Sequence, residues 1–323
     1  MLDILLWISL FISGYLIIFF AADLFIDNLK DLCVLYGVSP FIIGLIVLGI
    51  DPEESIASIV SAINGLSYLA IGNVIGNSIL SLSLCFALPA FFYKIDLKKI
   101  SRFYFLILYL CMAAIIFSFF IQFGLFVFGF IGIVIYFIYL FRSLKHISKK
   151  EEVDIINIKE VMEDIELEKE NLIEASKQKK ILFVSLGLIL IIVGGELLIF
   201  SAEGIIQLTG ISEAFFGFII IAFITNVEEL TLIFKSIKKK SIEIGLGGMI
   251  GKVIWNLSFT FGISGLFALN IEFNVVLILN WIILLVLIIY YQFKSMRKSL
   301  DKKDAIILFL FLIIFIIFNL IQL

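Results

Sequence analysis

The sequence predicts an all-α membrane protein with ten transmembrane helices arranged as two inverted five-helix repeats. Three observations support this fold class. The 323 residues are 62% hydrophobic and include 35 Phe, which leaves too little polar surface to cover a soluble globule. The apolar residues fall into runs of about 20, the length at which a helix crosses a bilayer. Finally, a glycine-rich pattern with paired glutamates occurs once in each half of the chain.

Ten apolar runs are long enough to span a membrane, and Gly, Asn or charged residues separate them. One long hydrophilic stretch divides these runs five and five. Because each half holds an odd number of spans, the halves enter the membrane from opposite sides, which is the inverted-repeat plan of many secondary transporters. The predicted spans are 4–22, 38–62, 66–92, 102–120, 123–141, 181–200, 211–236, 244–269, 273–292 and 304–322.

The spans define three parts of the chain. The N-terminal half is 1–141 and contains the first repeat, 37–83. The C-terminal half is 181–323 and contains the second repeat, 210–258. Between them, the charged loop 142–180 is acidic and then basic, and we interpret it as a solvated connecting helix.

Positive charge gives the orientation. Of the 24 Lys and Arg residues, 23 lie on alternate connections between the predicted spans. Cytoplasmic loops of membrane proteins carry an excess of Lys and Arg. The charged loop is therefore expected in the cytoplasm and both termini outside, in a multi-pass protein of the plasma (cell) membrane. The one exception to this distribution is Lys252, inside the eighth span.

The repeated pattern can be aligned residue by residue. One block recurs 173 residues later and the next block recurs 175 residues later, so the first copy lacks two residues just before its carboxylates. The first block contains Gly37, Ser39 and Gly44, and the second contains Glu53, Glu54, Gly72, Gly76 and Ser83.

Each copy places two adjacent glutamates in an apolar run, Glu53 and Glu54 in the first and Glu228 and Glu229 in the second. An ionised carboxylate there costs several kcal/mol unless it faces a polar interior or a bound cation. Neighbouring residues on a helix point in different directions, so one glutamate of each pair is expected to line the site and the other to lie at its edge. A buried structural ion pair or a protonated acid is the alternative interpretation.

Interruptions of the predicted helices near the glutamates would free backbone carbonyl oxygens for the site. Gly49, Asp51 and Pro52 interrupt the second span, and Thr225 and Asn226 disturb the seventh. A break at membrane depth is tolerated only where the freed carbonyls line a cavity or bind something. Carboxylate, carbonyl and amide oxygens together suit Na⁺, Ca²⁺ or Mg²⁺.

The second arm of each repeat carries glycines four residues apart, which allow close helix packing. A polar stripe follows beside them in steps of four residues, so its members share one helix face. Hydrogen bonding between helices without any ligand is the alternative explanation of this stripe. It consists of Asn73, Asn77 and Ser81 in the first copy and Gly248, Lys252 and Asn256 in the second.

At these residues the chain resembles the membrane region of sodium/calcium exchangers, in the cation/calcium antiporter superfamily. The family repeat reads G-[ST]-S-x-P-E in its first helix and G-N-x-x-G-[SN] in its second, and GNVIGN at 72–77 is close to the latter. The resemblance implies two inverted five-helix halves that exchange Na⁺, H⁺ or K⁺ for Ca²⁺ around a midplane site. It implies the metal ligands Glu54 and Glu229, and the further ligands Thr225, Asn226, Asn77, Ser81 and Asn256.

The chain departs from the family pattern in four places. The first motif is Gly-Ile-Asp-Pro-Glu-Glu, shorter by two, and the second, Ile-Thr-Asn-Val-Glu-Glu, lacks the proline. Asn256 stands where an acidic residue often occurs, and Lys252 occupies a small polar ligand position. A midspan Lys costs roughly 2.5 to 3.5 kcal/mol. We therefore expect Lys252 to pair with Glu54 or Glu229 as a tethered monovalent cation that replaces one transported Na⁺ and repels Ca²⁺.

The sequence thus predicts a secondary active cation antiporter that exchanges Ca²⁺ or a similar cation for Na⁺ or H⁺ by alternating access. No cofactor is expected, and the expected partners are the lipid bilayer and inorganic cations, not nucleic acid. The alternative is a non-transporting or ion-altered relative, neutralised by Lys252, that serves as a membrane scaffold. An enzyme is not expected, since no Ser/His or paired-Asp catalytic set occurs. The cation site would comprise Glu54, Glu229, Asp51, Thr225, Asn226, Asn77, Ser81 and Asn256, with Glu53 and Glu228 as secondary acidic residues.

Overall fold

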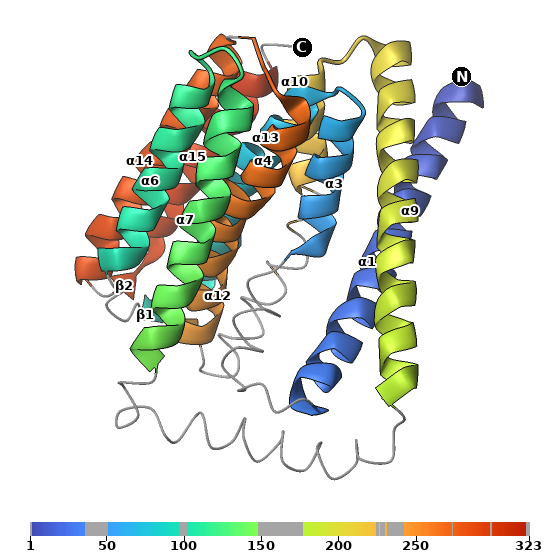
Figure 1. Cartoon of the computed structure of the whole chain (residues 1–323). Helices are drawn as coiled ribbons and strands as arrows, with labels where there is room; N and C mark the ends of the chain where they lie inside the picture. The colour runs from blue at the N-terminus through green and yellow to red at the C-terminus, as the bar shows by residue number, and fades with distance from the viewer. Residues whose placement is uncertain are drawn as a thin grey trace.

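The described part of the protein, in a computed structural model, is almost entirely helical (Figure 1). Within it, the regular β-structure is limited to β1 (Ile95–Asp96), which pairs antiparallel with β2 (Ser299–Leu300). The prediction of an all-α protein is confirmed for these residues. The structure describes residues 2–35, 51–96, 102–147, 177–223, 226, 230, 242–272, 274–297 and 299–320.

The described helices fall within or across each of the ten predicted spans. Their labels and bounds are α1 (Leu2–Leu35), α3 (Pro52–Ile63), α4 (Ser67–Leu82), α5 (Leu84–Phe92), α6 (Arg102–Ser118), α7 (Gly124–Ile147), α9 (Lys177–Thr209), α10 (Glu213–Phe215), the π-helix η1 (Phe216–Ile221), α12 (Ile242–Trp255), the π-helix η2 (Asn256–Thr260), α13 (Phe261–Ala268), α14 (Val275–Arg297) and α15 (Lys302–Leu320).

Seven of the described helical stretches are long and apolar enough to cross a membrane. Two shorter apolar helices lie at Glu54–Ile63 and Arg102–Ser118. The count of ten crossings stays a prediction, because most of the predicted span 38–62 and part of 211–236 lie outside the described residues.

Two helices are longer than their apolar runs. α1 and α9 extend well beyond the predicted spans 4–22 and 181–200. Hydropathy sets the length of the membrane-embedded part, whereas a helix ends where a cap or a breaker stops it. α9 ends at Thr209 because Gly210 follows with φ 71°, a left-handed conformation that glycine adopts without a Cβ clash.

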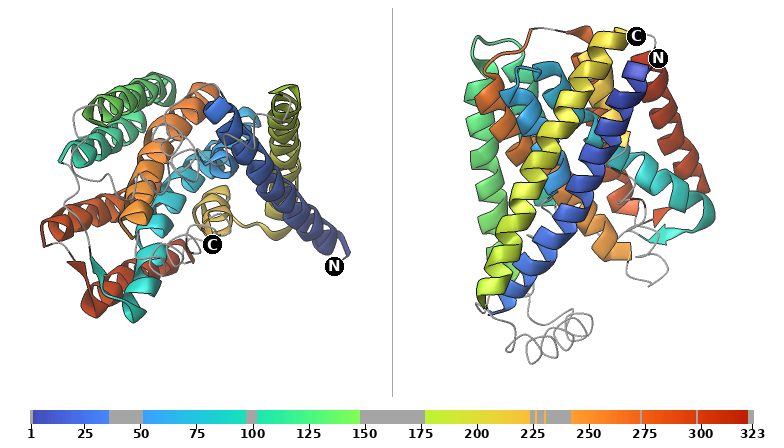
Figure 2. Two further views of the ribbon diagram at one scale, coloured as in Figure 1. Left: turned by 90° about the horizontal axis from the view of Figure 1, so that it is seen from below. Right: turned by 90° about the vertical axis from the view of Figure 1, so that its right-hand side faces the viewer.

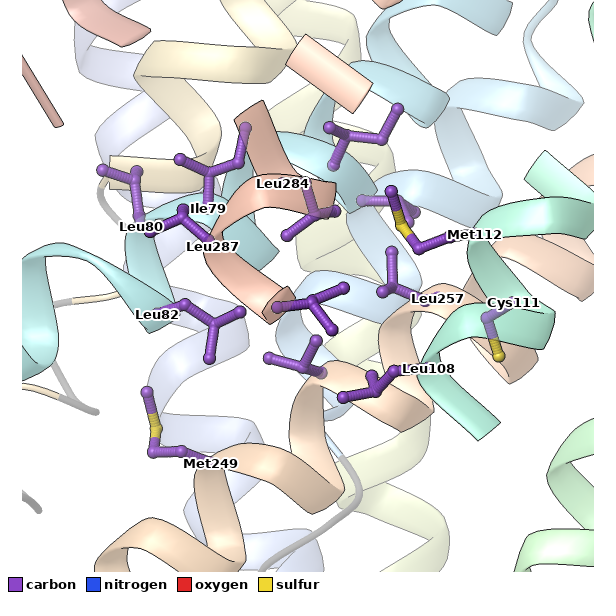
Figure 3. Close-up of a cluster of buried hydrophobic side chains, with 14 of the residues drawn as sticks. Ile79, Leu80, Leu82, Leu108, Cys111, Met112, Met249, Leu257, Leu284 and Leu287 are labelled. Carbon is purple, nitrogen blue, oxygen red and sulfur yellow. The ribbon is translucent and has the colours of Figure 1, made fainter. Parts of the chain in front are cut away.

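Two groups of helices lie at opposite sides of the molecule. α1 packs along α9 at one side of the molecule, and α6, α7, α14 and α15 lie at the other (Figures 1 and 2). α3 lies between the groups, since it contacts both α9 and α4. The larger of two hydrophobic clusters joins α4 and η2 to the group formed by α6, α7, α14 and α15. Figure 3 shows part of it, with Leu108, Met112, Leu257, Leu284 and Leu287 among its members.

A close crossing fixes the second arm of the first repeat. At Gly76 of α4, an added Cβ would lie 2.7 Å from the Cα of Phe218 in η1, so only glycine fits there. The equivalent residue of the second repeat, Gly251, is different, because its Cβ would meet only the Tyr139 hydroxyl, at 3.4 Å, among described atoms. The same motif position therefore bears a tight helix contact in one half and a loose one in the other.

Both repeats leave the regular α-helix at the same place. In the first, α4 ends at Leu82 and α5 begins at Leu84, with Ser83 between them. In the second, the equivalent Ser258 lies in the middle of η2. Short π-helical segments inside α-helices often occur at functional sites. The structure therefore places an irregular turn beside the polar stripe in both halves.

Candidate cation site

The centre of the site is built by the first turn of α3. Asp51 is the N-cap of this helix, Pro52 is its first residue, and the Asp51 Oδ1 accepts a hydrogen bond of 3.2 Å from the Glu54 amide. Aspartate at the cap and proline directly after it are strong helix-start signals. Because Glu54 follows three residues after Asp51, both carboxylates lie on this one turn, where the helix dipole favours negative charge.

Glu54 is buried, with 1% of its surface exposed, and both of its oxygens are bound. Oε1 accepts a hydrogen bond from Asn77 Nδ2 of α4, and Oε2 accepts one from Asn256 Nδ2 of η2. Hydrogen bonds to an ionised carboxylate are stronger than neutral ones. The orientation of the Asn77 and Asn256 carboxamides is consistent with these bonds, since an amide oxygen turned toward the Glu54 carboxylate would be repelled.

Lys252 of α12 brings a positive charge into the same cluster. Its Nζ lies 2.8 Å from Glu54 Oε1 and 2.5 Å from Asp51 Oδ2. Its side chain is 6% exposed, against 1% for Glu54 and 14% for Asp51. The contact with Glu54 is one of the two pairings that the sequence led us to expect. Asp51 as a second partner was not expected for this lysine.

The polar stripe of α4 continues the network away from Glu54. Asn77 Oδ1 accepts from Asn256 Nδ2 at 3.3 Å and from the Ser81 hydroxyl at 3.2 Å. The Ser81 hydroxyl also lies 2.8 Å from Asn226 Oδ1, and Asn226 is held by its own Nδ2, which donates to the Ala222 carbonyl. The stripe thus connects helices of both halves through a chain of side-chain hydrogen bonds.

The structure brings seven of the predicted site residues together: Asp51, Glu54, Asn77, Ser81, Asn226, Lys252 and Asn256. The remaining predicted residues, Glu229, Thr225 and Glu228, lie outside the described residues, as does the side chain of Glu53. The assignment of all these residues as cation ligands stays a prediction.

A second polar group beside the site was missed from the sequence. Ser55, next to Glu54, accepts a hydrogen bond of 2.8 Å from Trp255 Nε1 and lies 2.7 Å from the Thr260 hydroxyl. These contacts hold the first turn of α3 against η2. Trp255 directly precedes Asn256, and its indole N–H was the available signal, because a buried Trp usually finds an acceptor.

Two buried carboxamide oxygens have no hydrogen-bond partner among the described atoms, Asn73 Oδ1 and Asn256 Oδ1. Asn73 lies against α3, where its Nδ2 donates to Ser58 Oγ at 2.8 Å and to the Glu54 carbonyl at 3.3 Å. Buried acceptors are rarely left unpaired. Carboxamide oxygens are ligands of Na⁺-like and Ca²⁺-like ions, so Asn256 Oδ1 is a ready donor atom beside Glu54.

The described carboxylates do not by themselves make a dense metal site. No group of three or more His, Cys, Asp or Glu residues with metal-binding geometry occurs among the residues that the structure describes. Asp51 and Glu54 carry two negative charges, and Lys252 returns one positive charge. The described part of the site therefore has a net charge of −1 when all three groups are ionised, which attracts a cation but less strongly than two unpaired carboxylates would.

The sequence and the fold are similar to those of known membrane proteins. The chain is 24% identical over 294 residues to the uncharacterized membrane protein MJ0091 of Methanocaldococcus jannaschii, covering 87% of this chain and 90% of that protein. It is also 24% identical over 272 residues to the inner membrane protein YrbG of Escherichia coli, covering 81% of this chain and 80% of YrbG.

The fold matches solved structures of the sodium/calcium exchanger NCX_Mj. With the form soaked in 2.5 mM Na⁺ and 10 mM Sr²⁺, the TM-score is 0.60 at 21% identity, over 96% of this chain and 98% of the other. The structure of the sodium/calcium exchanger from Methanococcus jannaschii gives a TM-score of 0.59 at 20% identity, over 96% and 97% of the two chains. The family model described as sodium/calcium exchanger protein matches residues 6–145 and 179–321, most of the sequence, and the chain therefore belongs to the sodium/calcium exchanger protein family.

Proposed function

We propose that this protein is a secondary active antiporter that exchanges Ca²⁺ or a similar cation for Na⁺ or H⁺ by alternating access. Membership of the family makes it an integral, multi-pass membrane transporter rather than an enzyme. The observation that carries the proposal is the buried Glu54, because helices of both halves converge on its carboxylate. α3 and α4 come from the N-terminal half, and α12 and η2 come from the C-terminal half.

A site shared by two halves suits alternating access. In transporters built from inverted repeats, the ion site lies near the bilayer midplane at the interface between the repeats, and one part moves relative to the other around it. The network from Glu54 through Asn77 to Asn256 joins residues from the two halves of the sequence, which supports a site of this kind. In this proposal Glu54 and Glu229 are the central ligands, with Asp51, Thr225, Asn226, Asn77, Ser81 and Asn256 around them.

The proposed topology has ten spans in two inverted halves, with the charged loop 142–180 in the cytoplasm and both termini outside. The course of the described helices supports it. α1 begins and α15 ends at one end of the molecule, whereas the basic starts of α6, α9 and α15 and the basic end of α14 lie at the other end (Figure 1). Basic residues gather on the cytoplasmic side of membrane proteins.

The presence of Lys252 supports an ion preference that differs from that of a site built from carboxylates alone. Its ammonium already occupies the space between Asp51 and Glu54. We propose that it stands in for one transported Na⁺ and weakens Ca²⁺ binding by like-charge repulsion. The same contacts support the alternative, a non-transporting relative whose site Lys252 neutralises. Cation-dependent thermal stabilisation separates the two, because only a protein that binds the ion is stabilised by it.

The test of transport is ⁴⁵Ca²⁺ uptake into proteoliposomes loaded with Na⁺, repeated with an imposed pH gradient. We expect gradient-driven uptake that Glu54→Gln and Glu229→Gln each abolish. Glu203→Gln is the matched control, because Glu203 is hydrogen bonded only locally, to Gln207 one turn away, in the described structure. Absence of ⁴⁵Ca²⁺ uptake under both gradients would refute Ca²⁺ antiport, and uptake unchanged in Glu54→Gln would refute the site.

A further inference from the structure

We propose that Lys252 acts as a substitute ion during the return step of the transport cycle, so that cation exchange by this protein is not obligatory. After the cargo ion leaves, the ammonium compensates one of the two described carboxylates, as a bound monovalent cation would, and the site can reorient without a counter-ion. The protein then carries out net cation transport as well as exchange. This inference rests on the proposed function, because it needs a site that reorients in the membrane.

The first step of the argument is the charge of an empty site. Without Lys252, Asp51 and Glu54 would be two anions close together on one helix turn, and Glu54 is almost completely buried. A buried charge without a partner is strongly unfavourable. A carrier with such a site reorients only when a cation fills it, which makes exchange obligatory. In this structure the protein supplies the missing cation itself.

The second step is the position of the ammonium. Nζ lies within 3 Å of both carboxylates, 2.5 Å from Asp51 and 2.8 Å from Glu54. It thus occupies the place of a small monovalent cation held by two acidic side chains. Asn77 and Asn256 complete the environment of Glu54 with hydrogen bonds. The net charge of the site with Lys252 in place therefore resembles that of a site that holds a monovalent cation.

The third step is how the ammonium makes room for cargo. Lysine has a flexible four-carbon stem, which permits a short movement of its charge. Asp51 is the more exposed anchor, 14% against 1% for Glu54, and it lies at the start of the same helix. When a cation binds at Glu54, the ammonium can stay on Asp51, and the buried amide oxygen Asn256 Oδ1 is close enough in the network to turn toward the cation. Lys252 thus contacts both Asp51 and Glu54 in the empty site, and only Asp51 when cargo is bound.

The experiment compares two modes of ⁴⁵Ca²⁺ flux into proteoliposomes at equal pH on both sides. In exchange mode the lumen contains unlabelled Ca²⁺. In net mode the lumen contains choline in place of any transportable metal ion, and thiocyanate on both sides removes the membrane potential. Lumenal pyranine reports any proton movement. In the native protein we expect net flux within about tenfold of exchange flux, without proton efflux.

Lys252→Ser is the decisive variant. We expect it to retain exchange, since cargo fills the site throughout that cycle, and to lose net flux by about a hundredfold or more relative to exchange, because its empty site lacks the positive charge that Lys252 places against Asp51 and Glu54. Retained exchange also shows that the variant is folded. Glu203→Gln, outside the site, should keep both exchange flux and net flux, because Glu203 is hydrogen bonded only to Gln207 in the described structure.

The outcomes are distinct for the two proposals. No ⁴⁵Ca²⁺ flux in either mode would refute the proposed Ca²⁺ transport itself. Exchange flux in the native protein without net flux would overturn the role of Lys252 and leave the antiporter proposal intact. Net flux accompanied by equivalent proton efflux would also overturn it, because the counter-ion would then be a proton. Equal net flux in the native protein and in Lys252→Ser would do the same.

Discussion

Replacing Lys252 by Met should make the stability of this protein depend more strongly on cations than that of the native protein does. Met preserves the length of the side chain and removes its charge, so that the Asp51 and Glu54 carboxylates lose the ammonium at 2.5 and 2.8 Å. Breaking a buried ion pair by removing one partner costs about 3 to 5 kcal/mol. With about 2 cal/mol/K of unfolding entropy per residue over 323 residues, the unfolding midpoint in choline buffer should fall by about 5 to 8 °C.

Cations should then restore the variant. An ion that binds the folded state at about 100 times its dissociation constant stabilises it by about 2.7 kcal/mol. We expect Na⁺ or Ca²⁺ to recover much of the loss in Lys252→Met, and to have a smaller effect on the native protein, where the ammonium competes with them. The assay is thermal unfolding in detergent, titrated with NaCl, CaCl₂ or choline chloride.

Lys294→Met is the matched control. Lys294 also forms an ion pair with a buried acid, Asp304, which is 2% exposed and accepts a further hydrogen bond of 2.5 Å from the Tyr290 hydroxyl. The control should lose stability as well, but cations should not restore it, because the cluster lies outside the candidate site. Equal cation responses in both variants, or none in Lys252→Met, would contradict the view that Lys252 occupies a cation position.

Three further predictions follow from the structure. Lys252→Ser should bind Ca²⁺ or Na⁺ more tightly than the native protein in isothermal titration, since it removes like-charge repulsion, and unchanged affinity would contradict this. Gly76→Ala should lower the unfolding midpoint because its Cβ would meet backbone at 2.7 Å, whereas Gly251→Ala should be neutral or gain up to about 1 kcal/mol from helix propensity, so similar effects of the two would disprove the asymmetry. Asn280 and Asn319 exchange two hydrogen bonds of 2.9 Å, so either single change to Leu should cost about 1 to 3 kcal/mol and the double change should cost less than the sum, with additive losses as the contrary result.

Much of the fold follows from patterns that are local in the sequence. Apolar runs of about 20 residues predict the helices, and the start of α3 follows from the order Asp51, Pro52. The family resemblance, drawn from two short motifs, is confirmed over most of the chain. Helix ends were less predictable. The end of α1 at Leu35 was not predicted, because hydropathy does not indicate where a helix stops once it continues beyond the apolar run.

The candidate site was predictable in its members but not in its contacts. Spacing in steps of four placed Asn77 and Ser81 on one face of α4, and they do share a network. The pairing of Lys252 with Asp51 could not be read from the sequence, because it depends on how segments that are 201 residues apart in the chain are placed in the fold. The π-helix η2 was not predicted either, since we found no pattern in the sequence that separates it from the α-helix before it.

The cross-half ion pair of Lys252 has a consequence for how the protein is made. The stretch Met249–Ala268, which contains this lysine, has a mean hydropathy of 1.2, the lowest of the seven apolar stretches. During synthesis it reaches the membrane long after α3, whose Asp51 and Glu54 neutralise its charge in the finished protein. The C-terminal half expressed alone would therefore lack the Asp51 and Glu54 carboxylates that contact this ammonium. We expect this half to insert more efficiently when the N-terminal half, which is synthesised first, is already in the membrane.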